Sequence, residues 1–153
     1  MAEVLQQCSV SVHWEVRDSA MEVVLEMAQL SHVSKSTCLY LNLIFLPLFN
    51  YISMFVNFFF SGFPPFQQLL ISSHLIEAAL SAFNDTESYV RASAIGVIAA
   101  ATPVPLLWEH LSTFSSTPVI SSCYVVLQQD SEALARRAAA KALTLITQSG
   151  HFP

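Results

Sequence analysis

Hydrophobic residues recur at helical spacing in three stretches of this 153-residue chain. Apolar positions that are three and four residues apart lie on one face of an α-helix. The pattern defines one such face in each stretch: Val16, Ala20, Val23, Val24 and Met27; Val90, Ala94, Val97, Ile98 and Ala101; Ala135, Ala139, Ala142, Leu143 and Ile146. The sequence therefore predicts three amphipathic helices, each with one buried face.

The three predicted helices begin with variations of one phrase. The phrases align on three arginines, each followed three residues later by an alanine: Arg17 and Ala20, Arg91 and Ala94, Arg136 and Ala139. Asp85 and Asp130 lie six residues before the second and third arginines, and Ser11 takes that place in the first phrase. Internal repetition of this kind is typical of stacked helical hairpins.

Further helices are expected to precede the second and third phrases, over residues 68–83, 104–114 and 119–128. The helix that should pair with the first phrase is mostly missing from residues 1–10. Arg91 and Arg136 are 45 residues apart, within the range of about 40–47 for HEAT and armadillo repeats. Arg17 and Arg91 are 74 residues apart, which is too long for one repeat.

The repeated polar residues have two interpretations. A row of arginines can line a surface for an acidic partner, or each arginine can bond to the aspartate of the next repeat. We favour the second, a ladder formed by Arg17, Asp85, Arg91, Asp130 and Arg136. The aspartates, and Ser11, are also expected to cap the helices that follow them.

Small and aromatic residues at fixed places in the repeats predict the packing between helices. A recurrent alanine indicates a helix contact too close for a larger side chain. Aromatic residues at the helix starts are expected to pack between repeats. The predicted packing residues are Trp14, Ala20, Tyr89, Ala94 and Ala139.

The excess length between the first two repeats coincides with a hydrophobic block. Residues 37–60 are uncharged and long enough for a transmembrane helix, but Pro47 and Asn50 oppose one. A buried helix pair is a second interpretation, opposed by three consecutive phenylalanines and by Pro64-Pro65. Sequence alone leaves both open.

A third interpretation is that residues 33–67 are a translated intron, and we favour it. Val33-Ser34 corresponds to the splice-donor sequence GTAAGT, and Phe66-Gln67 to the acceptor TTTCAG. Deleting this block shortens the spacing of 74 residues to 39, close to one repeat. The expected organisation is a partial first repeat (1–32), the insertion (33–67), a second repeat (68–102) and a third repeat (103–150).

Composition argues against several functions. The net charge of −5 is unlike that of a nucleic-acid-binding surface, and the three cysteines are too few and too scattered for a disulfide framework. The sequence has no glycine-rich phosphate loop, and its five histidines are far apart. Glu109 and His110 resemble an acid–base pair, but we expect them to face water beside Trp108. We predict no catalytic, metal or cofactor site and no enzyme activity.

The three phrases carry a family resemblance. Residues 14–20, 87–94 and 130–138 resemble a HEAT-repeat segment of the breast-cancer-protein-associated ATM activator family, whose members are much larger scaffolds. The resemblance implies a fragment with a role near the ATM kinase in DNA-damage signalling. It also implies association with the breast-cancer susceptibility protein and the Integrator complex, in the nucleus and cytoplasm.

These observations predict an all-α fold, a HEAT/armadillo-like α-solenoid of about three helical pairs interrupted by a hydrophobic insertion. The predicted function is a non-enzymatic scaffold that presents a concave helical surface to protein partners. The alternative is a small membrane-anchored protein with one hydrophobic span at residues 37–60.

Overall fold

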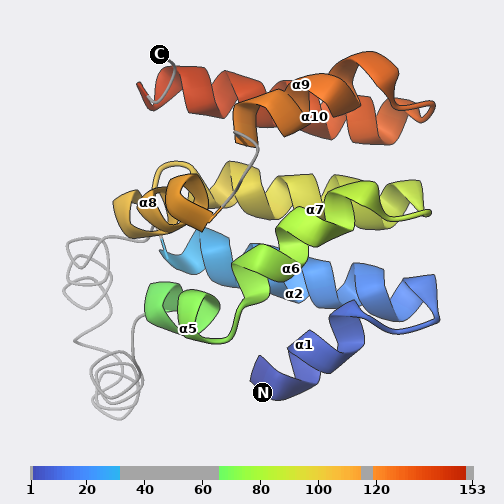
Figure 1. The fold of residues 1–153 in the computed structure, drawn as a ribbon, viewed down its shortest axis with the longest axis vertical. Coiled ribbons are helices and arrows are strands. Elements are labelled where there is room, and N and C mark those ends of the chain that lie inside the picture. Colours follow the sequence, from blue (N-terminus) through green and yellow to red (C-terminus); the bar gives the residue numbers. More distant parts are fainter. Residues whose placement is uncertain (1, 32–65, 115–118, 151–153) are drawn as a thin grey trace, which may run out of the picture.

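The computed structural model describes residues 2–31, 66–114 and 119–150, and within these ranges every regular element is a helix (Figure 1). The prediction of an all-α fold is confirmed. None of the helices in these ranges is long and apolar enough to cross a membrane. Most of the hydrophobic block, including the span expected at residues 37–60, lies outside the described residues.

The helices follow one another as hairpins joined by short loops. The first hairpin is α1 (Ala2–Ser9) and α2 (Trp14–Ser31). The next repeat has α5 (Phe66–Ser72), α6 (Leu75–Ser81), a 3₁₀ turn η1 (Ala82–Asn84) and α7 (Ser88–Ala101). The last has α8 (Pro105–Phe114), α9 (Val119–Gln129) and α10 (Ala133–Gln148). The second and third repeats therefore have three helices each, with α5 and α8 added to the hairpin.

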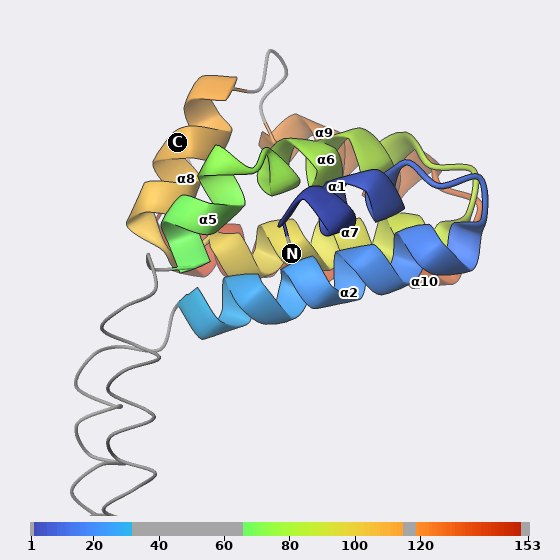
Figure 2. The same ribbon diagram turned by 90° about the horizontal axis from the view of Figure 1, so that it is seen from below.

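The helices form two layers. The second helix of each hairpin lies in one layer, where α7 packs between α2 and α10, and α1, α6 and α9 form the other layer (Figure 2). Helices α5 and α8 contact each other and lie together at one end of the layers. Because each repeat mainly contacts its neighbours, the fold is a stack of repeats with α1–α2 at one end and α9–α10 at the other (Figure 1).

The helices of the structure differ from the predicted ones mainly in three respects. The helix expected over residues 68–83 is broken at His74, whose φ of 53° and ψ of 28° are left-handed. Its first part, α5, begins at Phe66, within the expected insertion. Helix α1 forms over Ala2–Ser9 and packs on α2. The sequence had indicated that most of the partner helix of α2 was missing from this region.

The buried faces agree with the helical pattern for α7 but not fully for α2. All five residues expected on the α7 face are buried. In α2, however, Val16 and Val23 are 38% and 43% exposed, and Met21 and Ala28 are buried instead. Helix α2 packs against α1, α5 and α7 together. Its buried face is therefore turned from the one that periodicity alone suggested.

Candidate protein-binding groove and its supporting ion pairs

Arg17 of α2 and Asp85, which lies just before α7, join the first and second repeats. Arg17 Nε donates a hydrogen bond to Asp85 Oδ2, and Arg17 Nη2 donates one to Asp85 Oδ1, both at 2.7 Å. The two side chains are only 14% and 11% exposed. Parallel hydrogen bonds between a guanidinium and a carboxylate fix the orientation of both groups as well as their distance.

Arg91 of α7 and Asp130 join the second and third repeats with the same geometry. Arg91 Nε and Nη2 donate to Asp130 Oδ2 and Oδ1 at 2.7 and 2.8 Å. The third nitrogen of each arginine, Nη1, donates to two backbone carbonyls of the loop before its own helix, at 2.8 to 3.1 Å. Each arginine thus connects its own loop to the next repeat.

The aspartates hold the turns before the helices, but they do not cap the helices as we expected. The N-cap residues are Glu87 for α7 and Glu132 for α10, and neither side chain makes a capping bond. Asp85 Oδ1 accepts a hydrogen bond from the backbone N–H of Glu87, and Asp130 Oδ1 accepts one from Glu132, each at 2.9 Å. Such turns are a common use of aspartate. From this position both oxygens also reach the arginine of the preceding repeat.

The first repeat has a similar turn without a carboxylate. Ser11 Oγ accepts a hydrogen bond from the backbone N–H of His13 at 3.3 Å. A hydroxyl has one oxygen and no negative charge, so it cannot form the two parallel bonds that Asp85 and Asp130 form. Among the described residues, the first arginine–aspartate pair along the chain joins the first and second repeats.

The ion pairs change the pKa values of their members. The hydrogen bond from Arg17 is the main influence on Asp85 and holds its pKa below the ordinary value, although partial burial acts in the opposite direction. Arg91 lowers the pKa of Asp130 in the same way. The same bonds raise the pKa of both arginines. Each pair is therefore fully charged at neutral pH.

The predicted packing residues lie at two kinds of contact. Ala20, Ala94 and Ala139 are 3%, 0% and 0% exposed, each on the buried face of its helix. Trp14 of α2 and Tyr89 of α7 stack with their ring centroids 5.7 Å apart and their planes inclined by 22°. The stack is a second contact between the first and second repeats.

A groove of about 700 Å³ runs along the face formed by α2, α7 and α10. The floor is the part of α7 with short side chains, Ala92, Ser93, Gly96, Ala99 and Ala100, and Tyr89 at the start of α7 also lines the groove. The walls come from α2 and α10 and include longer side chains: Asp18, Glu22, Leu25, Gln29, Leu134, Arg137, Lys141 and Leu145. The layer is hollowed along its centre because short residues lie between longer ones.

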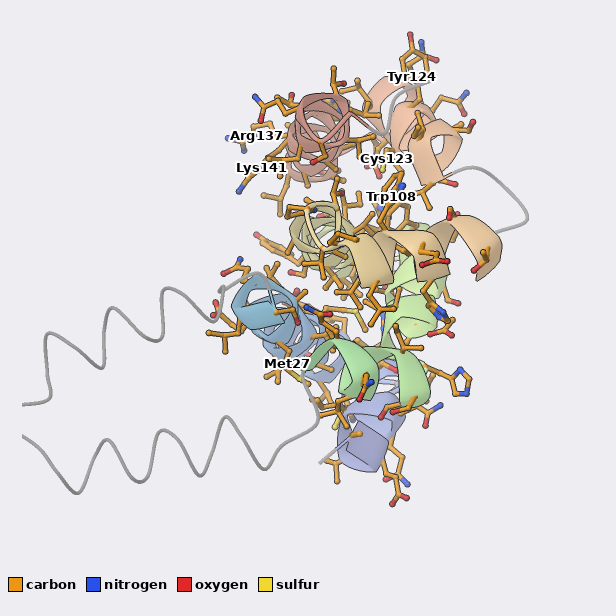
Figure 3. All side chains as sticks on the ribbon, turned by 90° about the vertical axis from the view of Figure 1, so that its left-hand side faces the viewer. Met27, Trp108, Cys123, Tyr124, Arg137 and Lys141 are labelled. Carbon is orange, nitrogen blue, oxygen red and sulfur yellow. The ribbon has the colours of Figure 1, made fainter. Side chains whose placement is uncertain are left out.

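The two walls of the groove carry opposite charges. Asp18 and Glu22 lie on the α2 wall, and Arg137 and Lys141 lie on the α10 wall. Ser93 Oγ donates a hydrogen bond of 2.7 Å to Asp18, which fixes the position of that carboxylate. Figure 3 shows Arg137 and Lys141 pointing away from the body of the protein on the face of this layer. Opposed charges above an apolar floor favour one orientation of a bound polypeptide segment.

Comparison with known proteins shows the family. The family described as "Integrator complex assembly factor BRAT1" matches residues 1–153. The chain belongs to the BRAT1 family. The resemblance inferred from the three repeated phrases is therefore confirmed.

A curated BRAT1-family relative from Danio rerio, "Integrator complex assembly factor BRAT1", is 27% identical over 145 residues. These residues cover 92% of this chain and 14% of the relative, so the chain spans about a seventh of that protein's length. No solved structure matches the chain. Within the described residues, no group of three or more His, Cys, Asp or Glu side chains is placed to hold a metal ion.

Sequence reasoning missed a polar cluster around a buried glutamate in this BRAT1-family chain. Glu77 of α6 is 9% exposed, and its Oε1 accepts hydrogen bonds from His74 Nδ1 at 3.1 Å and from His110 Nε2 at 2.9 Å. Burial raises the pKa of Glu77, but the bonds from His110, the backbone and His74 together lower it below the ordinary value. We had expected His110 to face water. Instead, its bond to Glu77 joins α8 to α6.

Proposed function

We propose that the chain is part of a non-enzymatic, HEAT/armadillo-like scaffold that binds proteins through the groove on α2, α7 and α10. The observation that supports this proposal is the origin of the groove in three successive repeats, with an acidic wall on α2 and a basic wall on α10. A polypeptide segment with a basic edge and an acidic edge fits such a groove in one orientation.

The ion pairs between repeats have a supporting role in this proposal. Arg17–Asp85 and Arg91–Asp130 join neighbouring repeats at two equivalent places. Because the groove walls lie on different repeats, the angle between repeats sets the separation of the walls. The arginine–aspartate ladder thus preserves the groove, and the arginines act on a partner only through the geometry that they maintain.

We infer that the bound protein is a component of the Integrator complex. The printed name of the Danio rerio relative describes a factor in the assembly of that complex. An assembly factor acts by binding proteins rather than by chemistry, which agrees with a groove lined by apolar and charged side chains. The corresponding location is the nucleus together with the cytoplasm.

The family resemblance supports a further role in DNA-damage signalling. We propose that the ATM kinase and the breast-cancer susceptibility protein bind the larger scaffold to which a segment like this belongs. A solenoid offers an extended surface, so several partners can occupy different repeats. The groove described above accounts for one of these binding surfaces.

Co-purification with the Integrator complex tests the proposal. The variant Glu22→Lys reverses one charge on the acidic wall, and Glu109→Lys is its matched control because Glu109 is also an exposed helical glutamate but lies on α8, outside the groove. We expect Glu22→Lys to reduce recovery of the purified complex several-fold and Glu109→Lys to leave it unchanged. Equal recovery with the two variants would overturn the assignment of the groove.

A further inference from the structure

The groove on α2, α7 and α10 carries opposite charges at two levels that are one helical turn apart. When the three repeats are aligned on their arginines, equivalent positions define the levels: Asp18, Ala92 and Arg137 at the first, and Glu22, Gly96 and Lys141 at the second. Figure 1 shows α2, α7 and α10 running in the same direction, so equivalent residues line the groove at similar depths. Each level thus has an acidic and a basic side chain on opposite sides of a short one.

The charges of the second level are not paired within the described part of the chain. Glu22 and Lys141 are exposed, and neither forms a salt bridge with a residue in the ranges 2–31, 66–114 and 119–150. Opposite charges held apart across a groove can each pair with a segment that enters it. Both walls are therefore available to a charged occupant.

Gly96 opens the floor at a place where the packing of α7 does not require a glycine. A glycine in a helix interior lowers stability relative to an alanine. Among the described residues, a Cβ added at Gly96 would meet only the methyl carbons of Leu25, at 3.4 and 3.7 Å, which are ordinary van der Waals distances. An alanine would therefore fit here, and the missing side chain instead permits the close approach of another backbone.

The floor offers an incoming backbone almost no hydrogen-bonding groups. Apart from Ser93 it consists of alanines and Gly96, and Ser93 Oγ already donates to Asp18. An extended segment on this surface would leave the N–H and C=O groups that face it without partners, which costs free energy. An α-helix satisfies these groups internally. A helix is therefore the form of polypeptide that can lie directly on the floor.

A helix from a second copy of this chain does not match both walls. A matching helix needs two basic residues four positions apart on one flank and two acidic residues four positions apart on the other, because residues at this spacing are neighbours on a helix. Among the described helices, only α10 has two basic residues at that spacing, and α10 contains no aspartate or glutamate. The occupant therefore has a different sequence.

We propose that the groove binds an amphipathic α-helix of a partner protein, with small apolar residues against Gly96, a basic pair facing α2 and an acidic pair facing α10. The basic pair contacts Asp18 and Glu22, and the acidic pair contacts Arg137 and Lys141. Small residues at the contact allow the axes of two helices to approach closely. This inference rests on the proposed function, because it specifies the chemistry of the protein that occupies the same groove.

A synthetic peptide of about 15 residues is the probe for this site. It carries alanines on one face, two lysines one turn apart on one flank and two glutamates one turn apart on the other, and a hydrocarbon staple on the remaining face keeps it helical. An unstapled peptide with a central proline is the non-helical control. Fluorescence anisotropy measures the binding of both peptides to the complete chain and to its variants.

The variants at Gly96 test the close approach of the helix. We expect Gly96→Leu to weaken binding of the stapled peptide at least about tenfold, because the added side chain fills the floor. Ala140→Leu is the matched control, since Ala140 is exposed on α10 but lies outside the groove, and should leave binding unchanged. Gly96→Ala should weaken binding less than Gly96→Leu does, yet raise the melting temperature of the chain by about 2–4 °C. Opposite effects on binding and stability indicate a binding role for Gly96.

The variant Glu22→Lys tests the pairing of charges. It should weaken binding of the stapled peptide several-fold and favour a second stapled peptide that has glutamates on both flanks. The proposal would be overturned by equal binding to Gly96→Leu and Ala140→Leu, by equally tight binding of the proline peptide, or by no binding of the stapled peptide at about 1 mM.

Recovery of the purified Integrator complex with the same variants separates this inference from the proposed function. Loss of recovery with Glu22→Lys but not with Gly96→Leu would retain the groove as the Integrator site and overturn the helix as its occupant. The expected peptide results, together with unchanged recovery for both variants, would support the helix and contradict the assignment to Integrator. Self-association of the chain that Glu22→Lys abolishes in sedimentation would assign the groove to a second copy and overturn the proposal.

Discussion

Arg91 and Asp130 join two repeats through parallel hydrogen bonds of 2.7 and 2.8 Å, although 39 residues separate them in the chain. Asp130 is only 6% exposed in this pair. A carboxylate so far from water depends on its partner for compensation of its charge. The contact between the second and third repeats therefore includes a charged pair whose members depend on each other.

Removing the arginine of this pair should destabilise the fold. We expect Arg91→Ala to lower the free energy of unfolding by about 2–3 kcal/mol, because it leaves a mostly buried carboxylate without its partner. Arg136→Ala is the matched control, since among the described residues Arg136 bonds only to its own loop, and it should cost less than about 1 kcal/mol. Urea unfolding measures both. Equal losses would contradict a special role for the pair between repeats.

Overpacking the contact at Ala94 should also destabilise the fold. Ala94 is fully buried on α7, so Ala94→Phe is expected to cost about 1–3 kcal/mol. Ala140→Phe adds the same side chain at an exposed position of α10 and should change stability by less than about 0.5 kcal/mol. An unchanged melting temperature for Ala94→Phe would mean that the buried face of α7 is wrongly assigned.

The lowered pKa values of Asp85 and Asp130 predict a loss of stability in acid. The unfolded chain, in which these carboxyls have ordinary pKa values, takes up protons first as the pH falls. Their contribution is therefore complete above about pH 4 and is lost as the pH falls through the lower pKa values of the folded protein. Urea midpoints between pH 6 and 3 measure this loss.

The matched variant for the pH series is Arg91→Gln, which removes the main cause of the shift at Asp130. We expect the urea midpoint of this variant to depend less steeply on pH below about pH 4 than that of the parent chain. Parallel curves would show that Asp130 does not contribute to the acid sensitivity.

The hydrophobic block should be absent from the main transcript. Helix α2, which ends at Ser31, packs against α5, most of which lies after the block, so the described residues before and after the block lie together. We expect the principal messenger RNA to lack codons 33–67 and the genomic DNA to read GT at Val33 and AG at Gln67. Abundant messages that retain the block, without those dinucleotides, would contradict a translated intron.

A deletion of residues 33–67 gives a second, biochemical test of the same hypothesis. The block is a long apolar run, so the complete chain should aggregate or bind membranes more than the shortened chain does. We expect the shortened chain to be more soluble and to remain mostly helical by circular dichroism. A shortened chain that is the less soluble of the two would mean that the block contributes to a genuine core.

The helical pattern and the repeated phrases contained most of what was needed to predict the fold. Val90, Ala94 and Ile98 lie on a buried face because a helix of the predicted period packs between two others. The face of α2 that is buried could not be predicted from the helical pattern in this way. Residues such as Val16 and Met21 are both apolar, and only the packing of α1 and α5 decides which of them is buried.

The groove and the Glu77 cluster depend on contacts that no local pattern records. His74 breaks the expected helix at a left-handed residue, and His110 comes from a different helix 33 residues after Glu77. Single polar residues at such separations carry no periodic signal. The short side chains of the groove floor, including Gly96, likewise looked like ordinary helix residues until α2 and α10 were seen on both sides of α7.

The most direct test of the central claim is site-specific photo-crosslinking to the purified Integrator complex. A photoreactive amino acid replaces Lys141, an exposed residue on the groove wall, or Ser112, an exposed residue of α8 outside the groove. If the groove binds a component of the complex, the probe at position 141 should crosslink to one subunit and the probe at position 112 should not. Crosslinking from position 112 alone would contradict the proposed role of the groove.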